Sequence, residues 1–253
     1  MEIENNVAII TGGASGLGAE TAIHLANLGA KVAIFDLNIE AAQLLADKLG
    51  GIAVTTDICN AESVADALSY VTNKIGTPRI LINCAGIGTA GRVVGRNGPL
   101  DLEIFSKVIS VNLIGTFNMI RLTGALMTSL EPLEDGERGV IISTASVAAY
   151  DGQIGQAAYA ASKGGIVSMT LPIAREFARF GIRLNTIAPG IFETPLLATL
   201  PEEAQKALGA SIPFPSRLGK PKEFAALVEA CISNAYINAE TIRIDGGVRL
   251  APK

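Results

Sequence analysis

Short apolar runs alternate with longer helical patterns along the chain, and this alternation limits the fold more than any other feature of the sequence. Apolar runs bounded by turn residues predict strands at residues 7–11, 31–35, 52–56, 80–83, 140–143, 183–188 and 241–244. Segments with helical spacing lie between them at residues 17–28, 39–49, 61–75, 102–130, 159–180 and 222–234. This order predicts a parallel sheet with right-handed crossovers and helices on both faces. We therefore predict one α/β domain over residues 1–253, a doubly wound Rossmann-type fold with a seven-stranded parallel sheet.

The composition agrees with strands that are buried on both faces. The 253-residue chain is 49% hydrophobic and 17% charged, and its formal net charge is −4. No broad basic surface is expected, so neither nucleic acid nor an anionic membrane is an expected partner. No apolar run reaches the roughly 18 residues that a membrane span requires.

Cysteine and histidine are scarce and widely spaced. Cys59, Cys84 and Cys231 show no CxxC spacing and His24 is a lone histidine, so we expect no metal site and give His24 a packing role. An odd cysteine count gives no disulfide framework and suits a reducing compartment. The first apolar run is already a strand and the N-terminal residues are acidic, so no signal or transit peptide is expected. These features predict a cytoplasmic protein, with the mitochondrial matrix left open if a transit peptide has been removed.

Two long segments interrupt the alternation of strands and helices. Residues 86–100 carry five glycines and two arginines, and residues 190–219 carry several prolines. Both would follow the carboxyl ends of strands, where open α/β sheets bind ligands. Long loops in a compact domain are usually functional or disordered. We expect the segment at about 190–219 to act as a substrate lid, with ordinary loop packing as the alternative.

A glycine-rich turn follows the first predicted strand and opens the first predicted helix. Residues 11–18 read TGGASGLG, with Gly12, Gly16 and Gly18 in G-x-x-x-G-x-G spacing. Glycines allow the backbone to approach a pyrophosphate closely, and the helix N-terminus offers free N–H groups to it. The position between strand and helix favours a dinucleotide site over a simple tight turn, which remains the alternative.

A carboxylate follows the second strand at Asp36, eighteen residues after Gly18. It can accept hydrogen bonds from the adenosine ribose and would repel a 2′-phosphate. No arginine or lysine follows directly. NAD(H) is therefore predicted over NADP(H). Asp36 could instead cap the next helix, although Asn38 could do so equally well.

Two further strand ends are candidates for cofactor contacts. Asp57 and Ile58 follow the third strand and could flank the adenine. Small residues follow the fourth strand and would let the cofactor ribose lie against the backbone; these are Asn83, Cys84, Ala85 and Gly86. Either segment could also be ordinary turn chemistry.

Tyr159 and Lys163 form a Tyr-x-x-x-Lys pair at the start of a predicted helix, thirteen residues after Ser146. A four-residue step puts the phenol and the ammonium on one helix face. A nearby cation is expected to lower the pKa of Tyr159 from its usual value near 10, so that the hydroxyl exchanges protons near neutral pH. A surface pair is the alternative on spacing alone. Ser146 could cap a turn or donate a hydrogen bond to a substrate oxygen, and its spacing to the pair favours the second role.

These motifs together resemble the short-chain dehydrogenase/reductase family. The matches are TGGASGLG at 11–18, Asp36, Asp57, NCAG at 83–86, NLIG at 112–115, Ser146, YAASK at 159–163 and PG at 189–190. Their order and spacing run nearly from end to end of the chain. The resemblance implies an NAD-dependent oxidoreductase in which Tyr159 is the general acid/base. It also implies that Lys163 binds the nicotinamide ribose and that Ser146 holds the substrate oxygen.

The resemblance implies further roles. Asn112 resembles a helix residue that holds a water connecting Lys163 to solvent. Ser15 and Leu17 match contacts of the cofactor loop, and the segment beside the nicotinamide is matched by Pro189, Gly190, Ile191, Phe192 and Thr194. Members of the family are usually homotetramers, and helices 102–130 and 159–180 resemble those that pair across subunits. Within the second of these helices, Ile166, Met169 and Ile173 could face either the core or a partner.

Residues 138–176, 186–197 and 213–219 are similar to one subgroup, the type 2 3-hydroxyacyl-CoA dehydrogenases, also called type 10 17β-hydroxysteroid dehydrogenases. The similarity implies that 3-hydroxyacyl-CoA and 3-oxoacyl-CoA are interconverted, with some activity on hydroxysteroids. Glu193 departs from the subgroup's pattern and leaves local substrate contacts open. The residues that could line an acyl channel are Leu196, Leu197, Leu200 and Phe214. Arg92, Arg96, Arg217 and Lys220 could meet CoA phosphates, although a solvated charged face is the favoured interpretation for each.

Two other functions remain open. The first is a dehydrogenase of the same family that acts on a hydroxysteroid, a polyol or an acyl-carrier-protein thioester. Carrier-protein reductases of this family usually prefer NADPH, which Asp36 disfavours. The second is a non-catalytic binding or scaffold protein, which the intact glycine turn, Tyr159 and Lys163 disfavour.

Overall fold

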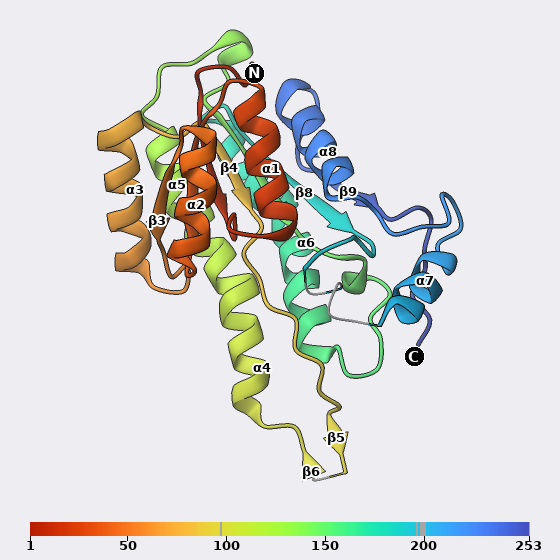
Figure 1. The fold of residues 1–253 in the computed structure, drawn as a ribbon. Coiled ribbons are helices and arrows are strands. Elements are labelled where there is room, and N and C mark those ends of the chain that lie inside the picture. Colours follow the sequence, from red (N-terminus) through yellow and green to blue (C-terminus); the bar gives the residue numbers. More distant parts are fainter. Residues whose placement is uncertain (97, 196, 198–200, 253) are drawn as a thin grey trace.

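A seven-stranded parallel sheet runs through the centre of the protein in the order β3-β2-β1-β4-β7-β8-β9 (Figure 1). The computed structural model describes residues 1–96, 98–195, 197 and 201–252. The strands are β1 (Val7–Thr11), β2 (Lys31–Asp36), β3 (Ile52–Thr55), β4 (Ile80–Asn83), β7 (Gly139–Thr144), β8 (Ile182–Pro189) and β9 (Thr241–Ile244). Every strand pairing within this sheet is parallel. The predicted fold class is confirmed.

Four of the inner strands are buried along their whole length, and β2 is buried except at its two end residues. Every residue of β1, β4, β7 and β8 is buried. Both faces of the sheet are covered by helices, so most side chains that point to either face are apolar. This is why the sequence shows continuous apolar runs here instead of strict alternation. The edge strands β3 and β9 are only partly buried.

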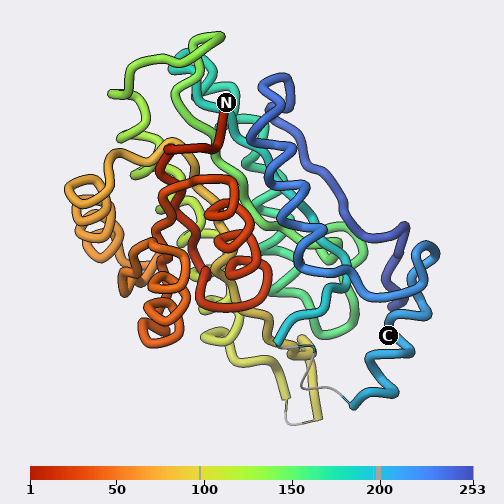
Figure 2. Tube along the Cα trace, turned by 45° about the horizontal axis from the view of Figure 1, so that its top comes forward, coloured from red at the N-terminus to blue at the C-terminus, as the bar shows by residue number. Residues whose placement is uncertain are grey.

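The longer helices cover the two faces of the sheet, except α4 and α7, which extend beyond it (Figure 1). The longer helices are α1 (Gly16–Asn27), α2 (Ile39–Leu49), α3 (Ala61–Ile75), α4 (Leu102–Ile109), α5 (Thr116–Met127), α6 (Ala157–Ala178), α7 (Glu202–Ala210) and α8 (Pro221–Ser233). Side chains of α1, α2 and α8 share one buried cluster with the sheet, and side chains of α3, α5 and α6 share the other. Figures 1 and 2 show the resulting three layers. Ile166 and Ile173 of α6 are buried, so they face the core.

The prediction of one continuous helix over residues 102–130 is wrong. A wider π-helical turn, η1 (Ser110–Gly115), separates α4 from α5, and the last of these helices ends at Met127. At Gly115 an added Cβ would lie 2.7 Å from Ile58. The buried side chain of Asn112 is held here by the segment after β4 and by α6. Such turns within α-helices are frequent at functional sites, and apolar periodicity does not reveal them.

Two elements inside the long segments were not predicted. A short hairpin, β5 (Val94–Gly95) with β6 (Gly98–Pro99), extends beyond the sheet near the start of α4 (Figure 1). Helix α7 lies inside the segment at 190–219, whose ends are joined by a bridge between Phe192 and Gly219. Short turns complete the fold at η2 (Glu134–Gly136) and η3 (Val147–Ala149).

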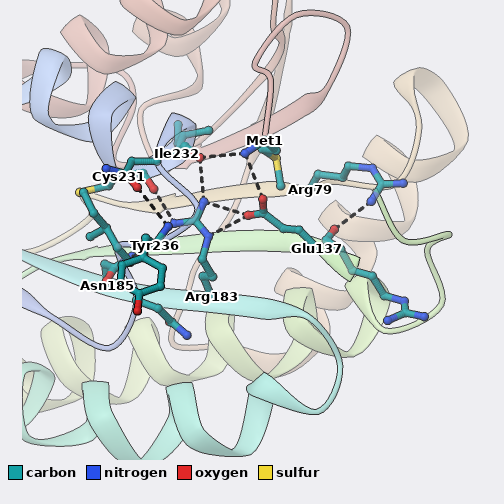
Figure 3. A network of polar contacts seen from close by, with 12 residues as sticks. Met1, Arg79, Glu137, Arg183, Asn185, Cys231, Ile232 and Tyr236 are labelled. Atoms are coloured by element: carbon teal, nitrogen blue, oxygen red, sulfur yellow. Dashed lines mark hydrogen bonds and ion pairs between the residues drawn. The ribbon is translucent and has the colours of Figure 1, made fainter. Parts of the chain in front are cut away.

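A buried network around the ion pair of Arg183 and Glu137 joins α8 to the amino end of β8 (Figure 3). The guanidinium of Arg183 lies 2.8 Å from Glu137 and donates to the carbonyl oxygens of Cys231, Ile232 and Ile237. Two of these carbonyls belong to the last turn of α8, whose carbonyl groups lack partners within the helix. The amino group of Met1 also donates to Glu137, at 3.0 Å. This network lies at the edge of the sheet opposite to the candidate site.

The direction of chain winding reverses between the neighbouring strands β1 and β4. The chain first fills the sheet from β1 outward to β3 and then from β4 outward to β9. The loops after β1 and β4 meet at the carboxyl edge, where the N–H of Cys84 donates to the Thr11 carbonyl at 3.1 Å. Crevices at such reversals are the usual ligand sites of open α/β sheets.

Candidate active site

The glycine turn after β1 forms a cradle that leaves no room for a side chain at Gly12 or Gly18. Gly12 has φ of +63°, and a Cβ there would lie 2.7 Å from the Ala85 backbone. At Gly18 a Cβ would overlap the Gly12 carbonyl oxygen. Ser15 precedes α1, is exposed and makes no capping bond with its side chain. The first N–H groups of α1 are therefore offered beside a bare backbone surface, which fits a pyrophosphate.

Asp36 turns its carboxylate toward this cradle. One oxygen accepts a hydrogen bond from the N–H of Ala14 at 3.0 Å, and the other accepts from the N–H of Asn38 at 2.9 Å. The α2 cap is provided by Asn38, whose side-chain oxygen accepts from Ala41. The alternative that Asp36 caps α2 is therefore wrong. A carboxylate so placed at the end of β2 fits the position of an adenosine ribose.

The segments at 57–58 and 83–86 follow β3 and β4, the strands on either side of β2 and β1. The carboxylate of Asp57 accepts from the N–H of Cys59 at 2.9 Å, as in an ordinary turn. Ile58 is buried, and its carbonyl accepts from Asn118. Beyond β4, the N–H of Ala85 donates to the Thr11 hydroxyl at 3.2 Å. The buried side-chain oxygen of Asn83 has no hydrogen-bond partner among the described residues.

Ser146 and Tyr159 are brought together although thirteen residues separate them. Ser146 is the N-cap of η3, two residues after the end of β7, and accepts a hydrogen bond from the N–H of Ala148 at 3.1 Å. It therefore does cap a turn, and its hydroxyl also lies close enough to Tyr159 to influence the pKa of that phenol. Burial raises the pKa of Tyr159 above its ordinary value of 10.0, and the Ser146 hydrogen bond opposes that rise. The prediction that the protein's own groups lower the Tyr159 pKa is therefore wrong. Desolvation of the phenolate raises this pKa by more than the neighbouring polar groups lower it.

Lys163 is buried one helical turn after Tyr159, so the two do not form a surface pair. Its ammonium lies 5.8 Å from the centre of the Tyr159 ring and donates to the Thr144 carbonyl at 2.6 Å. Burial lowers the pKa of Lys163 to about 8. The thiol of Cys84 lies 3.5 Å from the Thr144 hydroxyl, and burial raises the pKa of this thiol to about 11.

Asn112 connects three parts of the site. Its oxygen accepts from the N–H of Ile87 at 2.8 Å, and its amide donates to the Ile87 carbonyl at 2.9 Å and to the Ser162 hydroxyl at 3.0 Å. A Cβ on Gly86 would lie 3.1 Å from the Asn112 oxygen and 3.6 Å from the Lys163 nitrogen. Asn112 and Lys163 therefore face the same small space.

The segment after β8 closes the other side of the cradle. The N–H of Gly190 donates to the Ile244 carbonyl at 2.9 Å, and Phe192 is buried against Phe224 of α8. Thr194 and Pro195 lie next to Gly16 and line an open cleft of about 450 Å³ together with Glu20 and Glu193. The structure thus places both predicted cofactor segments, around 12–18 and 189–194, against each other.

Residues predicted to meet an acyl chain or CoA are more scattered. Leu197 packs against the cluster formed by Ile212, Leu218 and Val248, whereas Phe214 is 83% exposed. Leu196 and Leu200 lie outside the described residues. Of the four residues that could meet CoA phosphates, Arg217 pairs with Glu223 at 2.7 Å. The other three are exposed: Arg92, Arg96 and Lys220.

Sequence reasoning missed groups that carry little or no sequence signal. The Thr144 carbonyl receives the Lys163 ammonium, and the backbone of Ile87 holds Asn112. Any residue type provides such backbone groups. The Ser162 hydroxyl, by contrast, stands inside the YAASK motif and could have been proposed from its position beside Lys163.

Other expectations concern groups outside the site. The ring of His24 lies 2.7 Å from Glu229 between α1 and α8, which agrees with a packing role. The described residues contain no cluster of metal-ligating side chains. No helix in the described part of the chain is long and apolar enough to cross a membrane.

Comparison with known proteins agrees with this geometry. Residues 6–205 match the family model of short chain dehydrogenases. The chain is 50% identical to 3-hydroxyacyl-CoA dehydrogenase type-2 of Drosophila melanogaster, over 99% of this chain and 100% of the relative. It is also 50% identical to the Homo sapiens protein of that name, over 99% and 97%. The crystal structure of 3-hydroxyacyl-CoA dehydrogenase type-2 from Mycobacterium avium has a TM-score of 0.95 at 44% identity and 98% coverage of both chains. The chain therefore belongs to the short-chain dehydrogenase family and is an oxidoreductase.

Proposed function

We propose that this oxidoreductase interconverts 3-hydroxyacyl-CoA and 3-oxoacyl-CoA with NAD, with Tyr159 as the general acid/base. The observation that carries the proposal is the group formed by the partly buried Tyr159 and the buried Ser146 and Lys163, beside a glycine cradle. Relatives at 50% identity that bear the name 3-hydroxyacyl-CoA dehydrogenase type-2 support this choice of substrate.

Each residue of the group has a chemical task. Tyr159 donates its proton to the ketone oxygen during reduction and takes the proton of the alcohol during oxidation. Ser146 hydrogen-bonds the same substrate oxygen while negative charge develops there. The ammonium of Lys163 favours the phenolate in oxidation and binds the ribose hydroxyls. Bound NAD supplies the hydride acceptor and, as a cation, further favours the phenolate.

NAD is favoured over NADP by the carboxylate at the end of β2. Asp36 is held by the N–H groups of Ala14 and Asn38, so it cannot easily turn away from a ligand in the cradle. A 2′-phosphate would bring negative charge against it. The remaining predicted site residues are proposed as contacts of the same cofactor, and the segment at 190–219 is proposed as the substrate lid.

We further propose that the protein is a homotetramer. Large apolar side chains stay exposed along α4, η1, α5 and α6: Leu102, Ile104, Ile114, Phe117 and Leu171. Helices α4 and α6 pack side by side, so these side chains lie on neighbouring elements. Apolar side chains gathered in this way are typical of protein–protein interfaces.

Loss of NADH absorbance with acetoacetyl-CoA tests the function, with NADPH as the comparison. NADH should be consumed much faster than NADPH. In Tyr159→Phe, turnover should fall about 100-fold to 10,000-fold, the usual contribution of a general acid/base, while NADH still binds. Near-normal turnover of this variant would remove the role of Tyr159. Tight NADH binding without turnover of any acyl-CoA would point to another secondary alcohol, such as a hydroxysteroid.

A further inference from the structure

Arg243, on the edge strand β9, stands at the centre of a polar cluster outside the proposed catalytic group. Its guanidinium lies 2.7 Å from Asp151 and 2.7 Å from Asp245, and it also donates to the Val248 carbonyl at 3.1 Å. The Arg243 side chain is 21% exposed, and the guanidinium lies 5.1 Å from the ring centre of Tyr150. All five donors of an arginine lie in one plane, so one guanidinium can fix two carboxylates at once.

Asp151 belongs to the segment that connects Ser146 to Tyr159. This connecting segment has further fixed points. The N–H of Ile154 donates to the Pro252 carbonyl at 3.0 Å, and the Gln153 side chain donates to the Ala251 carbonyl at 2.9 Å. On its other side, the Gly155 carbonyl accepts from the N–H of Gly91 at 2.8 Å. Strand β9 and the chain after it therefore hold this segment at three places, and of these three contacts only the one to Asp151 is an ion pair between side chains.

Asp245 belongs to the other half of the site. A Cβ on Gly190 would lie 2.8 Å from the Asp245 side chain, so the two backbones are in direct contact. The turn that follows Asp245 also holds the end of the lid segment, because the N–H of Phe214 donates to the Gly246 carbonyl at 3.1 Å. Asp245 is therefore in direct contact with the segment that lies beside the proposed nicotinamide site.

We propose that Arg243 is a positioning residue that fixes the segment carrying Ser146 and Tyr159 relative to the segment carrying Gly190. The inference rests on the proposed function for the roles of those residues. Arg243 touches neither Ser146 nor Tyr159, and it acts through Asp151 and Asp245. Its loss should therefore misalign the proton-transferring hydroxyl and the cofactor ring without removing either binding surface. Small misalignments of reacting groups lower turnover more than ligand affinity.

Arg249 provides a matched control. It also pairs with Asp245, at 3.2 Å, but its side chain is 62% exposed. Its hydrogen bonds to Asp245 and Val248 stay within the turn after β9. In Arg243→Gln, kcat with acetoacetyl-CoA should fall about tenfold or more while the Kd for NADH stays within about twofold. Arg249→Gln should leave both constants unchanged. Arg243→Lys keeps one ion pair but not the fork, so it should recover part of the lost kcat.

Asp151→Asn gives a second and milder way to break the link. It should reproduce the fall in kcat, and the double variant with Arg243→Gln should show no further fall, because the two residues act as one unit. The pH profile of oxidation provides an independent readout. Displacement of Ser146 removes a hydrogen bond that lowers the Tyr159 pKa, so the profile should move to higher pH in Arg243→Gln and Asp151→Asn only.

Several outcomes would overturn the inference. One is a folded Arg243→Gln or Asp151→Asn protein with unchanged kcat and pH profile, whatever its melting temperature. Another is additive losses in the double variant. If Arg243→Gln does not fold, Asp151→Asn decides alone. Failure of the proposed function is recognised separately, because the unsubstituted protein itself would then not oxidise NADH with acetoacetyl-CoA.

Discussion

Lys163 is the buried cation of the candidate site, and its surroundings disfavour its charge. Burial lowers its pKa from 10.5 to about 8, so between these pH values the folded chain holds a neutral Lys163 while the unfolded chain holds a charged one. The unfolded state then binds more protons, and stability must rise with pH across this window. The full effect is on the order of 3 kcal/mol, at about 1.36 kcal/mol per pKa unit.

A comparison with Lys163→Met tests this sign. Without cofactor, the free energy of unfolding of the unsubstituted protein should gain on that of the variant as pH rises from about 8 to about 10. Urea unfolding followed by circular dichroism gives both curves; the chain contains no tryptophan for fluorescence. A constant offset between the curves is expected, because methionine cannot donate to the Thr144 carbonyl. Curves that stay parallel across the window would show that the Lys163 pKa is not lowered.

Asp36 should decide the choice of nicotinamide cofactor. In Asp36→Ala, the preference for NADH over NADPH should fall at least about tenfold, which corresponds to 1.4 kcal/mol of lost repulsion and hydrogen bonding. The ratio of kcat/KM for the two cofactors is the measurement. Asn38→Ala is the matched control, because it removes the α2 cap at about 1 kcal/mol of stability. The control should keep the NADH preference, and an equal change in both variants would contradict the role of Asp36.

At the scale of elements, the turn η1 shows how a local irregularity serves the site. The apolar pattern of residues 102–130 is that of one long helix, and the structure divides it at Ser110–Gly115. Asn112 in this turn reaches both the Ile87 backbone and Ser162. Helix α6 in turn places Tyr159, Ser162 and Lys163 within its first two turns. The turn η1 and helix α6 therefore contact each other through Asn112 and Ser162, which also lie next to the proposed catalytic residues.

The ion pair between Arg183 and Glu137 is the corresponding device for β8 and α8. In Arg183→Met, the free energy of unfolding should fall by about 3–5 kcal/mol, because a buried carboxylate and the last carbonyls of α8 lose their main partner. NADH affinity should change little, since the network lies at the opposite edge of the sheet. Arg79→Met is the control; Arg79 makes two bonds to carbonyls near the surface and its loss should cost less. Equal losses of unfolding free energy in the two variants would show that the buried ion pair contributes no more than the surface hydrogen bonds of Arg79.

At the scale of the whole molecule, the exposed apolar side chains on α4, η1, α5 and α6 predict assembly. Light scattering at micromolar concentration should give about four times the chain mass of 26.2 kDa. Phe117→Glu should lower that mass, because a charge would be buried in the interface. Tyr70→Glu on α3 is the control, since both aromatic side chains are 46% exposed. A monomer at micromolar concentration, or an equal effect of both substitutions, would contradict the predicted assembly.

The sequence by itself determined the order of strands and helices, the parallel sheet and the identity of the residues at its carboxyl edge. It could do so because apolar periodicity, glycine turns and Tyr-x-x-x-Lys spacing are local signals. The π-helical turn, the hairpin at 94–99 and α7 escaped this reasoning, since each interrupts a pattern over only a few residues. The position of Asp36 at the end of the second strand was predicted, but its hydrogen bonds from the N–H groups of Ala14 and Asn38 were not.

Only the tertiary structure decided the electrostatics of the site and how its parts are held. Ser146 meets Tyr159, Lys163 meets the Thr144 carbonyl, and Asp151 meets Arg243 across 92 residues of chain. The cation four residues after Tyr159 suggested a lowered tyrosine pKa, yet burial raises it. Desolvation depends on everything that packs around a group, and hydrogen bonds to backbone carbonyls depend on where strands end. Neither the desolvation of a group nor its hydrogen bonds to backbone carbonyls can be derived from the spacing of residues along the chain.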